Sequence, residues 1–165
     1  MNEKVFNVLF LCTENSARSI MAEGLLNKLG AGRFKAFSAG SNPSGQVSPF
    51  ALERLENEGI NIADVRSKSW DEFTQVDAPA LNFVITVCDN VAAEVRPIWF
   101  GQPITAHWGI PDPTRSDESS QRIAFARAFV MLERRIQLLT SLKPDNFERM
   151  ALQQQVRDIG QTKES

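Results

Sequence analysis

A cysteine followed six positions later by an arginine is the feature of this sequence most suited to chemistry. Cys12 and Arg18 flank residues 13–17, which read Thr-Glu-Asn-Ser-Ala. A thiolate is a strong nucleophile, and the planar guanidinium of arginine can bind two oxygens of one anion. The spacing alone is weak evidence, since about one cysteine in twenty has an arginine at this offset by chance. The pair suggests a site at which Cys12 attacks a tetrahedral oxyanion such as phosphate or arsenate.

The elements on either side of this segment strengthen that interpretation. Residues 5–11 form a nearly continuous apolar run, rich in β-branched and aromatic residues, which predicts a strand buried on both faces. Apolar residues then recur at helical spacing from Ile20 to Leu29, until Gly30 ends the pattern. A loop that leads into a helix N-terminus directs backbone N–H groups at a bound anion, and the helix dipole adds positive potential. The expected oxyanion-binding residues are Thr13, Glu14, Asn15, Ser16, Ala17, Arg18 and Ser19.

The same positive field bears on the ionisation of Cys12. Thiols at helix N-termini beside cations have lowered pKa values, so we expect a thiolate at neutral pH. Asn15 is expected to brace the loop through its neighbouring backbone groups, and Ser19 to donate a hydrogen bond to the thiolate. The alternative is that Cys12 is an inert core residue, because free cysteines are commonly buried.

The rest of the chain alternates between strand and helix patterns. Further strands are predicted at residues 34–39, 82–88 and 104–108, and further helices at residues 49–58 and 120–142. Such alternation implies parallel crossovers and therefore an α/β fold, a three-layer α/β/α sandwich with a four-stranded parallel sheet. Ligands of these sheets bind beyond the carboxyl ends of the strands. Cys12 and Cys88 each end a predicted strand, so both are expected at that edge.

Length and composition limit the classes of protein to consider. The 165 residues fit one domain, which we assign to residues 1–143, with a polar C-terminal helix and tail at 144–165. A net charge of −2 offers no basic excess for nucleic acid, and no apolar run is long enough for a membrane span. With two cysteines and one histidine, the chain has too few thiols for a disulfide framework and does not readily supply the ligands of a zinc site. We expect a cytoplasmic protein without a bound metal.

Several motifs, in order along the chain, resemble one known family. They are the run from Leu9 to Ser19, Met21-Ala22-Glu23, Ser38-Ala39-Gly40, Val87-Cys88-Asp89-Asn90 and the run from His107 to Pro113. Together they are similar to the low-molecular-weight protein tyrosine phosphatase superfamily, which includes thiol-coupled arsenate reductases. The resemblance covers roughly residues 5–142. It implies that Cys12 is the nucleophile, that Arg18 binds the oxyanion, and that Asp112 is the general acid that protonates the departing oxygen.

Other residues favour the reductase branch over the phosphatase branch. Tyrosine phosphatases of this family usually carry aromatic residues after the Asp-Pro pair, whereas this chain has Thr114-Arg115 and no tyrosine. An inorganic oxyanion therefore suits the site better than a phosphotyrosyl peptide. The leading hypothesis is an arsenate reductase, which converts arsenate to arsenite and acts in arsenical resistance. A phosphomonoesterase, which is a hydrolase, and a non-catalytic oxyanion-binding module stay open as alternatives.

Arsenate reduction needs a second thiol, which must attack the Cys12 sulfur and expel arsenite. Cys88 is the candidate for this step, although a buried strand cysteine without a role is an equal alternative. Thioredoxin-coupled members carry a third cysteine a few residues later, and Arg96 stands at that position here. The resemblance thus implies resolution by Cys88 or by an external thiol: glutathione, mycothiol, or a thioredoxin- or glutaredoxin-type protein.

Some reductases of the family bind a potassium ion beside the loop. Three of their ligands match Asn15, Glu23 and Ser38, and the fourth falls at Lys68. We expect the Lys68 ammonium to take the place of the cation and support the loop, with a solvated surface lysine as the alternative. His107 is expected to be a structural hydrogen-bonding residue rather than a general base.

Overall fold

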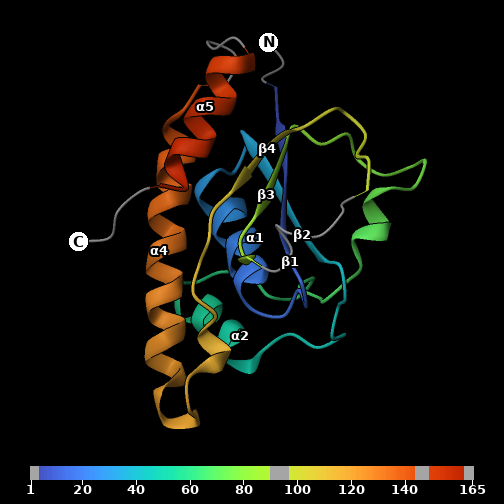
Figure 1. Cartoon of the computed structure of the whole chain (residues 1–165). Coiled ribbons are helices and arrows are strands. Elements are labelled where there is room, and N and C mark those ends of the chain that lie inside the picture. The colour runs from blue at the N-terminus through green and yellow to red at the C-terminus, as the bar shows by residue number, and fades with distance from the viewer. Residues whose placement is uncertain (1–3, 90–96, 144–148, 162–165) are drawn as a thin grey trace.

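A parallel sheet of four strands forms the centre of the molecule. The structure, a computed structural model, describes residues 4–89, 97–143 and 149–161. Its strands are β1 (Phe6–Cys12), β2 (Phe34–Gly40), β3 (Phe83–Thr86) and β4 (Ile104–His107), in the order β2-β1-β3-β4 (Figure 1). All three neighbouring pairs are parallel. The predicted α/β class with a four-stranded parallel sheet is confirmed.

The helices cover the sheet unequally. The α-helices are α1 (Arg18–Leu29), α2 (Pro49–Asn57), α4 (Gln121–Ser141) and α5 (Arg149–Ile159). Figure 1 shows α1, α4 and α5 on the same side of the sheet, and α2 packs against α1 and α4. Among the described residues, the opposite face carries only the short 3-10 helix η1 (Trp70–Phe73) and irregular segments. Two further 3-10 helices, η2 (Pro113–Arg115) and η3 (Glu118–Ser120), precede α4.

The central strand β1 has buried side chains on each of the two faces of the sheet, which explains its continuous apolar sequence. Alternation along the strand puts Phe10 on the α1 side, where its ring lies 6.0 Å from that of Trp108. Leu9 and Leu11 therefore point to the opposite face, and both are fully buried. On the edge strand β2, Phe37 extends that second core and packs edge-on against Phe73 of η1 at 5.5 Å. Burial on two faces is typical of parallel sheets.

The C-terminal helix α5 is part of the core. Leu152, Val156 and Ile159 are buried, and the indole Nε1 of Trp108 donates a hydrogen bond of 3.0 Å to the carbonyl of Val156. This contact ties α5 to the residue that follows β4. A helix in this part of the chain was expected, whereas the division of the chain at residue 143 stays a prediction.

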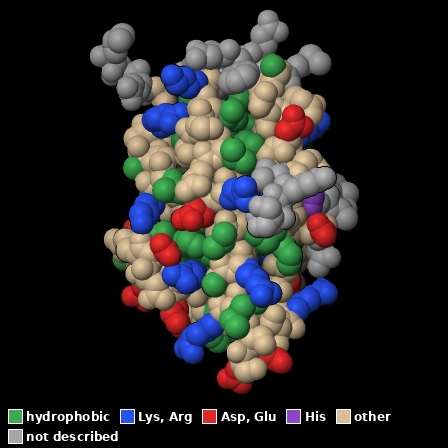
Figure 2. Space-filling view, turned by 90° about the vertical axis from the view of Figure 1, so that its left-hand side faces the viewer, with side chains coloured by type: hydrophobic (Ala, Val, Ile, Leu, Met, Phe, Trp, Pro, Cys, Tyr) green, Lys and Arg blue, Asp and Glu red, His purple; other side chains and the backbone are tan. Residues whose placement is uncertain are grey.

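Figure 2 shows the outer face formed by α4 and α5, where hydrophobic side chains lie among lysines and arginines. Ile123 and Val130 of α4 are among the exposed apolar residues. None of the helices in the described part of the chain is long and apolar enough to cross a membrane.

Candidate active site

The loop between β1 and α1 is fixed from behind by a buried asparagine. Asn15 has a left-handed backbone conformation, with φ of 50°, which asparagine adopts more readily than most residues. Its Nδ2 donates to Ser19 Oγ at 2.8 Å, and its Oδ1 accepts from the Lys68 backbone N–H at 2.9 Å. Asn15 and Ser19 are both fully buried. The side chain of Asn15 thus braces the loop, as the sequence suggested.

A second segment holds the loop from outside. The backbone N–H groups of Asn42, Ser44 and Ser48 donate to the carbonyls of residues 13, 14 and 16, at 2.9, 3.1 and 2.8 Å. Carbonyl oxygens that bond away from the loop leave its N–H groups on the concave side, which is the arrangement of an anion-binding nest. This support by residues 42–48 was missed in the sequence, which offers no local signal for a contact of this kind.

Gly40 is a further residue whose importance the sequence analysis missed. It ends β2 directly beside the loop, and a Cβ placed there would lie 2.9 Å from the Cys12 carbonyl oxygen and nearer still to that of Thr13. Only glycine leaves room for this approach. A glycine at the end of a strand is a known sign of close backbone approach, so the signal was present.

The two cysteines lie together at the carboxyl ends of β1 and β3. Cys12 and Cys88 are free thiols, 4% and 3% exposed, and their side chains are in hydrogen-bonding contact. The backbone N–H of Thr13 donates to Cys88 Sγ at 3.3 Å, and the Thr13 hydroxyl lies 3.6 Å from the same sulfur. The structure thus brings the two thiols to one loop, as their positions at strand ends predicted. The role of Cys88 as a resolving thiol stays a prediction.

The ionisation of Cys12 differs from the sequence-based expectation. The hydrogen-bonding contact with Cys88 and then burial raise the pKa of the Cys12 thiol far above its usual value. Arg18 and the Thr13 backbone N–H act in the opposite direction, but more weakly. The expected lowering of this pKa is therefore wrong for this arrangement, because a neighbouring thiol and lost hydration outweigh the positive field.

Arg18 and Asp112 meet at the rim of the loop. Arg18 Nη1 donates to the Ile110 carbonyl at 2.9 Å, and its Nη2 lies 3.7 Å from Asp112 Oδ2. Asp112 caps η2, where its Oδ1 accepts bonds of 2.9 and 2.6 Å from the backbone and hydroxyl of Thr114. Burial acts to raise the pKa of Asp112, but the bonds from Thr114 and the charges of Arg18 and Arg115 hold it below its usual value.

This lowered pKa matters for the role expected of Asp112. The carboxyl is ionised at neutral pH, so in this arrangement it holds Arg18 and Arg115 rather than carrying a proton. Asp112 lies where the sequence predicted an acid, and its function as a general acid stays a prediction.

Two adjoining cavities open at this edge of the sheet, and they share Arg18, Asp112 and Arg115. The smaller, of about 180 Å³, is lined by Cys12 and by four loop residues: Thr13, Glu14, Ser16 and Ala17. The larger, of about 560 Å³, is lined by Cys88, Asp89, Gly109, Ile110 and Pro111. Each cysteine therefore belongs to its own cavity.

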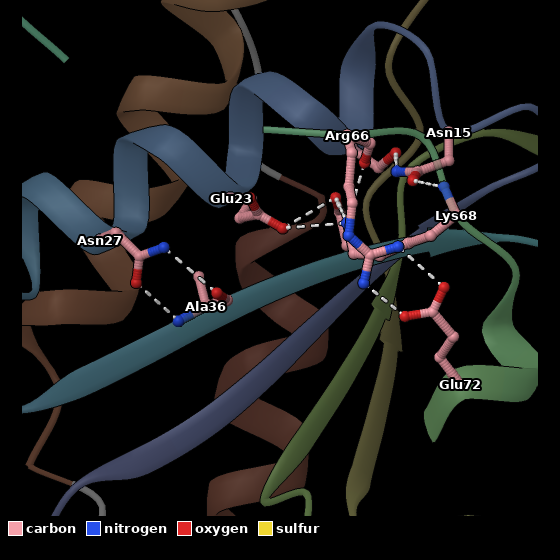
Figure 3. A network of polar contacts seen from close by, with 9 residues as sticks. Asn15, Glu23, Asn27, Ala36, Arg66, Lys68 and Glu72 are labelled. Carbon is pink, nitrogen blue, oxygen red and sulfur yellow. Dashed lines mark hydrogen bonds and ion pairs between the residues drawn. The ribbon is translucent and has the colours of Figure 1, made fainter. Parts of the chain in front are cut away.

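A buried polar cluster lies behind the loop, and Figure 3 shows Glu23 and Lys68 directed toward each other within it. Ser38 Oγ donates to Glu23 Oε1 at 2.9 Å. Lys68 Nζ lies 3.6 Å from Glu23 Oε1, 3.5 Å from Ser38 Oγ, and donates to the Arg66 carbonyl at 3.0 Å. Lys68 is only 9% exposed, so the alternative of a solvated surface lysine is wrong.

Burial dominates the ionisation of both charged members of this cluster. Desolvation raises the pKa of Glu23 and lowers that of Lys68, in each case against the attraction of the partner. Burying the Glu23–Lys68 pair costs desolvation free energy, and the hydrogen bonds to Ser38 and to the Arg66 carbonyl offset part of that cost. No group of three or more His, Cys, Asp or Glu side chains suited to a metal is found in the part of the chain that the structure describes.

His107 has hydrogen bonds at both ring nitrogens. Its Nδ1 lies 2.7 Å from Thr86 Oγ1, and its Nε2 lies 2.8 Å from Asp89 Oδ1. These bonds agree with a structural role. Arg96, which stands where a third cysteine was expected, lies outside the described residues.

Comparisons with known proteins agree on one family. The family model for low molecular weight phosphotyrosine protein phosphatase matches residues 7–152. An arsenate reductase of Halalkalibacterium halodurans is 35% identical over 73% of this chain and 82% of its own length. A glutaredoxin arsenate reductase of Synechocystis is 36% identical over 64% of this chain and 77% of its own. The crystal structure of an arsenate reductase from Archaeoglobus fulgidus superposes with a TM-score of 0.66 at 30% identity, covering 82% of this chain and 99% of that one.

Proposed function

The chain belongs to the low molecular weight phosphotyrosine protein phosphatase family, and on this premise we propose that it is a thiol-dependent arsenate reductase. The observation that carries the proposal is the placement of both cysteines at the oxyanion loop, where the N–H of Thr13, the residue after Cys12, donates to Cys88 Sγ at 3.3 Å. Hydrolysis of a phosphoester needs only one cysteine, whereas reduction of arsenate needs a second thiol within reach of the first. Relatives named arsenate reductases, one of them glutaredoxin-linked, support the same reaction.

In the first step, arsenate occupies the smaller cavity above the loop. The backbone N–H groups of residues 13–17 and the N-terminus of α1 bind its oxygens. Arg18 turns from the Ile110 carbonyl to the anion, where its fork binds two oxygens. The Cys12 thiolate attacks arsenic and displaces one oxygen, which leaves as water once protonated. The product is a Cys12–arsenic(V) adduct.

In the second step, Cys88 attacks the sulfur of Cys12. The electron pair of the sulfur–arsenic bond remains on arsenic, which leaves as arsenite, and the two sulfurs form a Cys12–Cys88 disulfide. The two electrons gained by arsenic come from the two thiols. An external thiol reductant then restores both cysteines through a mixed disulfide.

Both reactions need a group that protonates the departing oxygen, and Asp112 is the candidate for this role. Its carboxyl is ionised in this structure, as aspartate ordinarily is at neutral pH, so Asp112 does not separate the two reactions. Thr114 and Arg115 follow Pro113 and line the smaller cavity, and none of the described residues that line it is aromatic.

The function is tested by supplying purified protein with arsenate and dithiothreitol and, separately, with an aryl phosphate. We expect arsenite formation that Cys12→Ser abolishes and negligible hydrolysis of the aryl phosphate. Efficient hydrolysis without arsenite would establish the phosphatase alternative. Binding of phosphate without turnover of either substrate would establish the oxyanion-binding module.

A further inference from the structure

The proposed capture of arsenate takes place in the smaller cavity, so the larger one is left without an assigned ligand. Arsenate has only five heavy atoms, which the smaller cavity over the Cys12 loop is placed to hold. The larger cavity, at about 560 Å³, lies within the range of about 300–1,000 Å³ that is usual for small-molecule sites. Cys88 is the cysteine that lines it. Three of its other wall residues, Gly109, Ile110 and Pro111, line no part of the smaller cavity.

We propose that this larger cavity binds the external reductant, a small thiol that carries a carboxylate and an ammonium group, and that this thiol attacks Cys88. The proposal rests on the proposed function, because it concerns how the Cys12–Cys88 disulfide is reduced. Glutathione represents the chemical class.

The charges around the cavity fit a zwitterionic thiol. Arg115 is 81% exposed, and its Nε lies 3.7 Å from Asp112, so the outer donors of its guanidinium can bind a carboxylate. Asp89 lines the same cavity with a carboxylate that is 90% exposed and accepts one hydrogen bond from His107. An ammonium group of the thiol would bind there. Positive and negative side chains thus border one space beside the Cys88 sulfur.

Gly109 lies beside Asp89 in the wall of this cavity and leaves space there. A Cβ at this position would lie 3.2 Å from Asp89 Oδ1 and 3.3 Å from His107 Nε2. A larger side chain would therefore crowd Asp89 and narrow the cavity without touching the loop around Cys12.

Because the two cysteines line different cavities, the reductant in the larger cavity attacks the sulfur of Cys88 rather than that of Cys12. A thiolate that attacks Cys88 forms a mixed disulfide on Cys88 and releases the Cys12 thiolate beside Arg18, ready for the next arsenate. A second thiol then attacks the mixed disulfide, which gives the oxidised small-molecule disulfide and the Cys88 thiolate. Two electrons pass from two thiols to the protein disulfide. Attack on Cys12 would instead place the bulky reductant in the cavity that arsenate needs.

The decisive experiment locates the mixed disulfide. Protein carrying the Cys12–Cys88 disulfide is mixed with less than one equivalent of glutathione, and excess N-ethylmaleimide then traps free thiols. Trypsin separates the two cysteines, because Arg18 and Lys68 lie between them in the sequence. We expect glutathione on the Cys88 peptide and N-ethylmaleimide on the Cys12 peptide. Glutathione on Cys12, or a disulfide that only a protein thiol can reduce, overturns the proposal.

The charge requirement is tested by comparing glutathione with its diethyl ester, which lacks both carboxylates. We expect the ester to reduce the disulfide about 10-fold more slowly, because it cannot form one charge-assisted hydrogen bond that glutathione forms. Arg115→Gln should remove this difference, whereas Arg122→Gln, on a distant surface arginine paired with Glu53, should preserve it. Equal rates for both thiols with the unmodified protein contradict the proposed recognition.

Failure of this inference can be distinguished from failure of the proposed function. Arsenite formation driven by dithiothreitol measures the reductase activity without glutathione. If that activity is present and glutathione is found on Cys12, only the inference about the larger cavity fails. If it is absent, the reductase proposal itself fails.

Discussion

Opposing influences act on the sulfur of Cys12. The contact with Cys88 and burial favour the thiol, whereas Arg18 and the Thr13 N–H favour the thiolate. Activation therefore needs a change at the site when the substrate enters. Movement of Arg18 from the Ile110 carbonyl toward the loop, together with separation of the two thiols, would supply it.

The influence of Cys88 on Cys12 can be measured directly, because these are the chain's two cysteines. In Cys88→Ala the contact that raises the pKa of Cys12 is lost. This pKa therefore falls, and alkylation of Cys12 by iodoacetamide begins at a lower pH. The matched variant Cys88→Ser replaces the thiol by a hydroxyl that can donate to the Cys12 thiolate, so its midpoint should also lie below that of the unmodified protein. The rate at which the Cys12 peptide is alkylated, followed against pH by mass spectrometry, checks both shifts. An unchanged midpoint in Cys88→Ala contradicts the account.

Lys68 supplies the second prediction at this scale. Its ammonium lies beside Glu23 and Ser38, where some relatives are expected to bind potassium. In Lys68→Asp the ammonium is replaced by a carboxylate next to Glu23, so the cluster needs an external cation. We expect the melting temperature and the KM for arsenate of this variant to improve with KCl but not with choline chloride, and those of the unmodified protein to change little. Potassium activation of the unmodified protein would show that Lys68 does not replace the cation.

At the scale of elements, the site depends on how closely β2 approaches the loop after β1. Gly40 ends β2 against the carbonyls of Cys12 and Thr13, and its N–H donates to the Lys68 carbonyl. The loop is thus held between the end of β2 and the segment at residues 42–48. Elements far from the cysteines in sequence set the position of the N–H groups.

Gly40→Ala tests this dependence. The added methyl group would clash with the Thr13 carbonyl, and the loop would have to shift. We expect binding of phosphate, measured by calorimetry, to weaken by about 10-fold or more, equal to about 1.4 kcal/mol. Gly45→Ala is the control for a nearby glycine with open space around it, although its positive φ carries some strain. Normal phosphate binding in Gly40→Ala would mean that the loop position is not set by β2.

Particular elements show how far the sequence could predict this structure. The strand at β1 and the long helix α4 were foreseen almost to the residue, because apolar periodicity reports burial directly. The strand expected at residues 82–88 ends at Thr86, where its pairing with β4 stops. The sign of the Cys12 pKa change was wrong because it depends on contact with Cys88, which tertiary packing creates. Burial of Lys68 was undecided in the sequence for the same reason.

At the scale of the whole molecule, α5 closes the core behind β4. Val156 is fully buried, its carbonyl accepts the indole bond from Trp108, and Trp108 in turn packs against Phe10 of β1. A chain of contacts therefore connects the C-terminal helix with the strand that carries Cys12.

Val156→Ala tests the contribution of this helix to stability. The lost methyl groups and the cavity that remains should lower the free energy of unfolding by about 2 kcal/mol. Urea denaturation followed by tryptophan fluorescence measures this change, and Gln155→Ala on the exposed face of α5 is the matched control. Equal stability of the two variants would show that α5 adds little to the core.

In the proposed reaction, Cys12 and Cys88 together supply the two electrons that convert arsenate to arsenite. The most direct measurement is a single turnover of fully reduced protein with arsenate and no external thiol, with arsenite and disulfides quantified together. We expect one arsenite per protein molecule and an equal amount of a Cys12–Cys88 linked peptide, and neither product in Cys88→Ser. Stoichiometric arsenite from Cys88→Ser, or no arsenite from the unmodified protein, would contradict the proposed reaction.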